Sequence, residues 1–221
     1  MSFIRPACDV SENNGEPEWL PINWGRVVAS KEVELVMARA CLGTSRPDHA
    51  FAVKWAALRR TPLIQAAYCY CIPGMAPTLL ADARAHAHYL WQMVMLQGGP
   101  HKDDLPPMLD VEITNGLAAT QLQEWTDASL TELQSLSGRI PILYSNEWFL
   151  GYYLGPLLKK WPILVSAYQL KEPTLEPRVG WQYENNGYIP GIQTPVDRDW
   201  WSGPWPGTVE WQSTFVKKGG V

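Results

Sequence analysis

Two acidic residues separated by one position, Asp110 and Glu112, are the side chains of this sequence that most directly suggest chemistry. They close an apolar run, residues 107–112, that we expect to form a β-strand. On a strand, residues i and i+2 point to the same side, so both carboxylates share one face and Val111 points to the other. Such close carboxylates cannot ionise independently, and the pKa of the more buried one is raised towards the working range of a general acid. The pair therefore suggests glycoside cleavage, which typically uses two carboxylates.

Two further acids, Asp9 and Asp197, end the first and last strands that we expect. In a parallel barrel, side chains at the C-terminal ends of the strands converge on one site, so all four acids are candidates for it. Other interpretations stay open, because acids at strand ends also cap helices, pair with Arg, or bind magnesium or calcium. The 12 Trp and 9 Tyr are equally open, since aromatic rings fill cores and also stack on sugar faces.

Short apolar runs alternate with helical patterns along most of the chain. We expect strands at residues 4–10, 34–40, 63–70, 107–112, 140–145, 163–168, 180–183 and 195–197. We expect helices at residues 48–60, 78–97, 120–137 and 148–158. This alternation is the pattern of parallel βαβ units, and the helical segments stop after about residue 160. The prediction is an α/β fold, a parallel TIM-like barrel whose last strands lack helices.

Length and composition exclude several classes of protein. The chain has 221 residues, 46% of them apolar and 18% charged, which fits one folded domain over residues 1–221 with a tail at 203–221 packed on the barrel. A net charge of −4, without a basic stripe, predicts no nucleic-acid partner. Prolines interrupt the uncharged stretch 62–81, so we expect no membrane span. We expect a monomer.

Four cysteines, Cys8, Cys41, Cys69 and Cys71, lie early in the chain without a CxxC spacing. A large intracellular domain does not need disulfides, so free and mostly buried thiols are the expectation. A disulfide and a metal site remain as alternatives, although zinc sites usually use a spacing of two to four intervening residues.

A series of short segments, in order and spread over residues 8–200, resembles glycoside hydrolase family 25, the Chalaropsis-type lysozymes or muramidases. The most specific of them is the run from Leu105 to Glu112, which is similar to the family's Leu-Pro-x-x-Leu-Asp-x-Glu. The matching segments are Cys8-Asp9-Val10-Ser11, Ile22-Asn23-Trp24, Ala40-Cys41-Leu42-Gly43-Thr44, Ala67-Tyr68-Cys69-Tyr70, Leu105-Pro106-Pro107-Met108-Leu109-Asp110-Val111-Glu112, Pro141-Ile142-Leu143-Tyr144-Ser145, Trp181-Gln182-Tyr183, Ile189-Pro190-Gly191-Ile192 and Val196-Asp197.

The resemblance implies a flattened barrel of eight strands and about five helices that hydrolyses the β-1,4 bond between N-acetylmuramic acid and N-acetylglucosamine. It implies that Glu112 is the proton donor and that Asp110 supports the charged transition state or the substrate's acetamido group. Asp9 and Asp197 would shape the field of the site. The implied cleft residues are Tyr68, Tyr144 and Trp181, with a core role equally open for Trp181. The partner would be peptidoglycan glycan strands, with no metal or cofactor.

Four positions depart from the family pattern: Leu42, where Glu is common, Cys69, where His is common, Leu164, where Trp is frequent, and Asp199, where Asn is common. None of them removes one of the four acids. They put the substrate subsites in doubt, and they suggest the hypothesis that Cys69 is an exposed thiol at the mouth of the cleft.

Two rival functions stay open. A chitinase-like hydrolase also carries an Asp-x-Glu at a strand end, and a non-catalytic glycan-binding or virion structural protein could use the same fold. The N-terminus lacks the pattern of a secretory signal, so we expect synthesis in the cytoplasm. A muramidase would then reach the wall through a membrane pore made by another protein, as phage endolysins do, or as a delivered effector.

Overall fold

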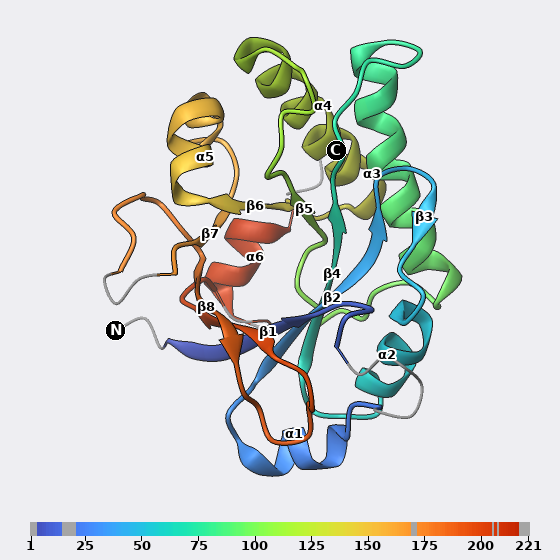
Figure 1. Cartoon of the computed structure of the whole chain (residues 1–221), viewed down its shortest axis with the longest axis vertical. Coiled ribbons are helices and arrows are strands. Elements are labelled where there is room, and N and C mark those ends of the chain that lie inside the picture. Colours follow the sequence, from blue (N-terminus) through green and yellow to red (C-terminus); the bar gives the residue numbers. More distant parts are fainter. Residues whose placement is uncertain (1–3, 15–20, 169–171, 205, 207, 217–221) are drawn as a thin grey trace.

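The computed structural model describes residues 4–14, 21–168, 172–204, 206 and 208–216. Within this part of the chain, eight strands form a closed ring in the order β1-β9-β8-β7-β6-β5-β4-β2, and β2 pairs back to β1 (Figure 1). A ninth strand, β3, pairs with β2 outside the ring. The strands are β1 (Arg5–Val10), β2 (Leu35–Leu42), β3 (Arg46–Pro47), β4 (Ile64–Tyr70), β5 (Met108–Asp110), β6 (Ile142–Asn146), β7 (Ile163–Ser166), β8 (Gly180–Gly187) and β9 (Val196–Trp201). The α/β barrel that the sequence predicts is confirmed.

The helices lie mainly between the earlier strands, as the alternating pattern predicts. They are α1 (Trp24–Ser30), α2 (Phe51–Leu58), α3 (Leu79–Leu96), α4 (Ala119–Ser137), α5 (Glu147–Tyr153), the 3-10 helix η1 (Gly155–Leu157) and α6 (Val209–Phe215). The four expected helices correspond to α2, α3, α4 and the pair α5–η1, whereas α1 and α6 were not predicted. Gly138 ends α4 at a φ of 68°, a left-handed conformation that glycine adopts without strain.

One strand runs in the opposite direction to the prediction. The sequence predicts a parallel last strand that ends at Asp197, but β9 is antiparallel to both β1 and β8, and Asp197 is its second residue. The connection from Tyr188 to Pro195 contains no helix and is too short for a parallel crossover, which needs a dozen or more residues. Because β9 runs backwards, its start lies at the same end of the barrel as the C-terminal ends of the other strands.

Strand alternation divides the buried apolar residues into two clusters. Outward-facing residues such as Val111, Leu109 and Val36 pack between the barrel and the helices. Inward-facing residues such as Met37, Met108 and Leu164 fill the barrel itself. This division fixes which polar side chains of each strand point into the barrel and which point away from it.

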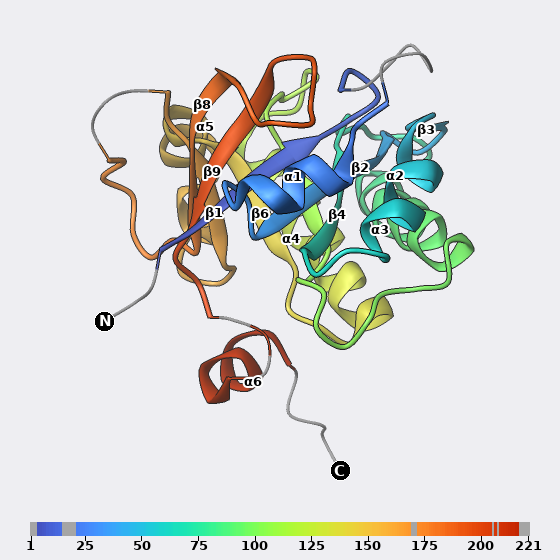
Figure 2. The same cartoon turned by 90° about the horizontal axis from the view of Figure 1, so that it is seen from below.

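Helix α6 closes the barrel at the end where the parallel strands begin. Trp211 and Phe215 belong to the cluster inside the barrel, and the Ile140 amide, just before β6, donates to the Phe215 carbonyl at 2.8 Å. Figure 1 shows α6 at the centre of the ring of strands, and Figure 2 shows it at one end of the barrel. Of the expected tail 203–221, residues 205, 207 and 217–221 lie outside the described residues.

Truncating Trp211 tests how much this closure contributes to stability. Trp211 is only 2% exposed, so Trp211→Ala is expected to lower the free energy of unfolding by about 3 kcal/mol through lost burial and a cavity. Thermal unfolding measures the loss, with Trp148→Ala as control because Trp148 is 65% exposed. Equal effects of the two substitutions would contradict a stabilising role for α6.

Candidate active site

A cavity of about 130 Å³ opens at the end of the barrel opposite α6. It has room for several water molecules, and its lining combines carboxylates, phenol rings and an apolar floor. The lining residues are Asp9, Met37, Tyr68, Met108, Asp110, Glu112, Tyr144, Leu164, Tyr168, Gln182 and Asp197. The four acids predicted from the sequence therefore meet in one cavity, together with Tyr68 and Tyr144.

Asp110 and Glu112 lie at the end of β5 as the i, i+2 spacing predicts. Both line the cavity, whereas Val111 between them is fully buried in the outer cluster. Asp110 is 7% exposed and Glu112 is half-buried, so Asp110 lies deeper and Glu112 nearer the mouth. One oxygen of Asp110, Oδ1, is buried without a hydrogen-bond partner among the described residues.

Asp9 and Asp197 face each other across the strands β1 and β9, where they are register partners. Asp9 accepts hydrogen bonds from the Tyr68 hydroxyl at 3.1 Å and from the Gln182 side-chain amide. The Gln182 carbonyl oxygen in turn accepts from the hydroxyls of Tyr144 and Tyr168, both at 2.6 Å. One glutamine therefore connects an acid on β1 with two tyrosines on the far side of the cavity.

Burial raises the pKa of every carboxyl in this group, and repulsion between neighbouring carboxylates adds to it for Asp9, Asp110 and Asp197. Burial, followed by the charge of Asp197, raises the pKa of Asp9 to about 8. Burial and the charge of Glu112 raise the pKa of Asp197 to about 6. Burial, followed by Glu112 and Asp9, raises the pKa of Asp110 well above its usual range, and burial alone raises that of Glu112. At neutral pH the cavity therefore holds protons as well as negative charge, which is the condition for general-acid chemistry.

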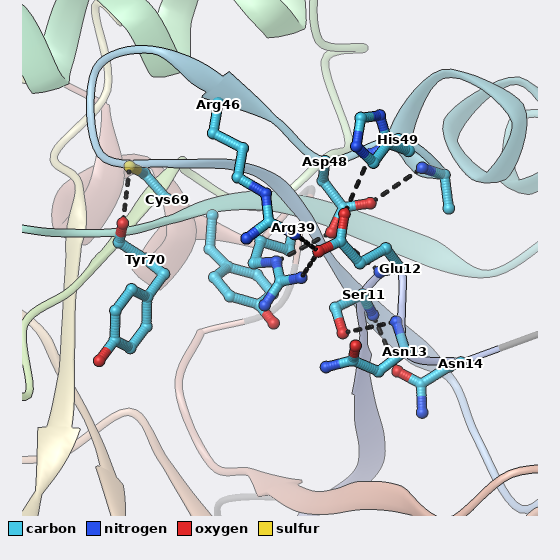
Figure 3. Close-up of polar contacts among 12 residues, drawn as sticks. Ser11, Glu12, Asn13, Asn14, Arg39, Arg46, Asp48, His49, Cys69 and Tyr70 are labelled. Atoms are coloured by element: carbon cyan, nitrogen blue, oxygen red, sulfur yellow. Dashed lines mark hydrogen bonds and ion pairs between the residues drawn. The ribbon is translucent and has the colours of Figure 1, made fainter. Parts of the chain in front are cut away.

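The guanidinium of Arg39 opposes the rise in these pKa values, although the sequence analysis did not single this residue out. Arg39 pairs with Tyr68 in the sheet, and its charge lowers the pKa of both Asp9 and Asp110. Figure 3 shows how it is held, with Asp48 at 2.8 Å and Glu12 at 3.2 Å. The signal in the sequence was its position two residues after the inward-facing Met37 on the same strand.

Two other cavity residues, Gln182 and Tyr168, were also not predicted as site residues. Gln182 follows Trp181 on β8, and the two side chains point to opposite faces of the strand. The structure brings Gln182 into the cavity and leaves Trp181 outside it, where its indole nitrogen donates to the Ala167 carbonyl at 2.9 Å. Of the three predicted cleft aromatics, two line the cavity, and Trp181 does not.

The hypothesis of an exposed Cys69 is wrong. Cys69 lies on the outer face of β4, because the neighbouring Tyr68 points into the barrel, and it is fully buried in the outer cluster. Its thiol contacts the Gly43 carbonyl at 3.6 Å. It also contacts the Tyr70 carbonyl at 3.5 Å (Figure 3). All four cysteines are buried free thiols in this structure.

The described residues contain no group of three or more His, Cys, Asp or Glu side chains arranged to hold a metal ion. No helix among them is long and apolar enough to cross a membrane.

One family model matches most of this chain. Residues 8–192 match the sequence profile of glycosyl hydrolases family 25. An uncharacterized Escherichia coli K12 protein, YegX, is 27% identical over 201 residues, which cover 88% of this chain and 69% of YegX.

Solved structures of the same fold cover most of this chain. A lysozyme from Streptomyces coelicolor has a TM-score of 0.74 at 21% identity, covering 93% of each chain. The autolysin LytC from Streptococcus pneumoniae, solved with a synthetic peptidoglycan ligand, has a TM-score of 0.74 at 22% identity, covering 90% of this chain and 46% of LytC.

Proposed function

The chain belongs to glycosyl hydrolase family 25, and on this premise we propose that it is a muramidase. The proposed reaction is hydrolysis of the β-1,4 bond between N-acetylmuramic acid and N-acetylglucosamine in bacterial peptidoglycan. The observation that supports it most is the pair Asp110 and Glu112, which share a cavity walled by tyrosines and closed at its far end. The glycan strands of the cell wall are the proposed partner.

Glu112 is proposed as the general acid. It is the carboxyl of the pair nearer the mouth, so it can reach the glycosidic oxygen of a glycan strand lying across the opening. Burial raises its pKa, which keeps a proton on it for delivery to the leaving oxygen. The pKa values of Asp110 and Glu112 are both raised, so they do not decide between the two. Glu112 is assigned the role because Asp110 lies deeper in the cavity.

Asp110 is proposed to hold the substrate sugar. Its Oδ1 atom is buried and has no hydrogen-bond partner among the described residues, so it is open to a donor that enters the cavity. The acetamido N–H of an N-acetylated sugar is such a donor, and a carboxylate there also stabilises positive charge that develops on the sugar ring. A buried polar atom without a partner is costly, and substrate binding would remove that cost.

The remaining lining residues are proposed to shape the site around this pair. The hydroxyls of Tyr68 and Tyr144 hold Asp9 and Gln182, while their rings present flat surfaces to the sugar. Asp9 and Asp197 set the field of the cavity, since each raises the pKa of a neighbouring carboxyl.

Digestion of defined peptidoglycan tests the proposal. The purified protein is expected to release fragments with reducing N-acetylmuramic acid ends, identified by mass spectrometry, and to leave chitin intact. Peptidoglycan whose sugars have been N-deacetylated should be cut more slowly, because the donor for Asp110 is gone. Cleavage of chitin would favour a chitinase-like enzyme, whereas binding to peptidoglycan without new reducing ends would favour a glycan-binding protein.

A further inference from the structure

A fifth carboxyl, that of Asp199, lies inside the barrel below the four acids. It follows Asp197 by two positions on β9, so it points into the barrel one layer closer to the floor. Its register partners are Ala7 on β1 and Gln182 on β8. Asp199 is only 1% exposed and is not part of the cavity lining.

Little compensates this carboxyl beyond the nearby Gln182 amide. Neither of its oxygens has a hydrogen-bond partner among the described residues. Burial is the largest cause that raises its pKa, followed by the charges of Asp9 and Asp197, and the Gln182 amide beside it opposes them. An ionised carboxylate with so little compensation is very unfavourable in such a place, so burial favours the protonated form of Asp199.

The surroundings of Asp199 contain few groups that change charge. From β1 these are Asp9 and the Cys8 thiol, from β9 Asp197, and from β8 the Tyr183 hydroxyl. Arg39 lowers the pKa of Asp9 but is not among the groups that act on Asp199. Loss of the proton from Asp199 would therefore place a new negative charge next to two acids, with only the Gln182 amide to meet it.

We propose that Asp199 is a positioning residue that must remain protonated for the site to work, and that its ionisation, together with loss of the Glu112 proton, lowers activity at alkaline pH. Ionised Asp199 competes with Asp9 for the Gln182 amide. The Gln182 carbonyl oxygen accepts from the hydroxyls of Tyr144 and Tyr168. Reorientation of the Gln182 side chain therefore also disturbs both tyrosines, which line the cavity. The activity part of this inference rests on the proposed function, whereas the link from Asp199 to Gln182 does not.

The first experiment compares pH–activity profiles of the wild type and Asp199→Asn on peptidoglycan. Asn has the same shape and cannot ionise, so kcat/KM is expected to stay within about twofold at acidic pH, while the alkaline limb moves up by about one pH unit. Asp104→Asn is the matched control, because Asp104 is also buried, at 5% exposure, with a pKa raised by burial, but it precedes β5 at the other end of the barrel. Superimposable profiles for the wild type and Asp199→Asn would overturn the proposal, as would the same shift in Asp104→Asn.

The second experiment needs no substrate. The Gln182 side-chain amide signal, assigned by its loss in Gln182→Leu, is followed by nitrogen-15 NMR as the pH rises. Ionisation of Asp9, which accepts from this amide, is expected to shift the signal in both proteins. A second shift, caused by Asp199, is expected in the wild type and not in Asp199→Asn. A Gln182 signal that does not titrate, or that titrates equally in both proteins, overturns the inference. A wild type that cuts no peptidoglycan at any pH instead refutes the proposed function, and the NMR titration still decides whether Asp199 controls Gln182.

Discussion

Glu112→Gln is expected to lower kcat/KM on peptidoglycan by about 10⁴-fold, the upper range for loss of a general acid. The amide keeps the size of the side chain but has no proton to deliver, so a poor leaving group must depart as an alkoxide. The loss corresponds to about 5 kcal/mol of transition-state stabilisation. Burial raises the pKa of Glu112, so the neutral amide is expected to leave the unfolding temperature unchanged or higher.

Two measurements separate lost chemistry from lost binding in Glu112→Gln. The variant should still bind glycan strands, so kcat falls far more than KM changes. Glu124→Gln, at an exposed position on α4, makes the same chemical change away from the cavity and should keep full activity. Activity of Glu112→Gln within tenfold of the wild type would remove Glu112 from the role of acid.

The positions of the carboxylates could be predicted because they depend on strand alternation alone. Asp110 and Glu112 share the cavity and Val111 does not, as the i, i+2 spacing requires. The barrel could be predicted for a similar reason, since repeated strand and helix patterns have few ways to bury both apolar faces. Residue spacing was therefore sufficient for features that depend on a single strand or helix.

The direction of β9 was predicted wrongly, although the sequence contains its cause. The connection from Tyr188 to Pro195 has no helix and cannot cross the barrel, so an antiparallel return was the only one it allows. Asp197 reached the site nonetheless, because the start of a reversed strand lies where the end of a parallel one would be.

The polar residues that support the acids could not be predicted. Gln182 acts through contacts with Asp9, Tyr144 and Tyr168, which come from three other places in the chain. Arg39 acts on Asp9 across a strand boundary. The spacing from Met37 shows that Arg39 faces inward, but spacing along one strand does not show which inward-facing side chains meet after the barrel closes.

Asp110→Asn is expected to lose about 10³-fold in kcat/KM and yet to be more stable than the wild type at neutral pH. The activity falls because the amide cannot supply negative charge to the sugar in the transition state. The stability rises because burial, together with Glu112 and Asp9, raises the pKa of Asp110 in the folded state. A carboxyl with a raised pKa costs nothing below its unfolded pKa of about 3.9, and its cost grows as the pH rises above that value.

Thermal unfolding of Asp110→Asn and the wild type at pH 4 and pH 7 tests what the buried carboxyl does. The unfolding temperature of Asp110→Asn should exceed that of the wild type by about 2–4 °C at pH 7, the shift that ~1 kcal/mol gives in a domain of this size, and should match it near pH 4. Asp103→Asn changes an exposed carboxyl and should alter neither activity nor stability. If Asp110→Asn gains stability and stays active, Asp110 contributes only a buried charge. If Asp110→Asn loses activity while it gains stability, the carboxylate of Asp110 destabilises the fold and is needed for its action on the substrate.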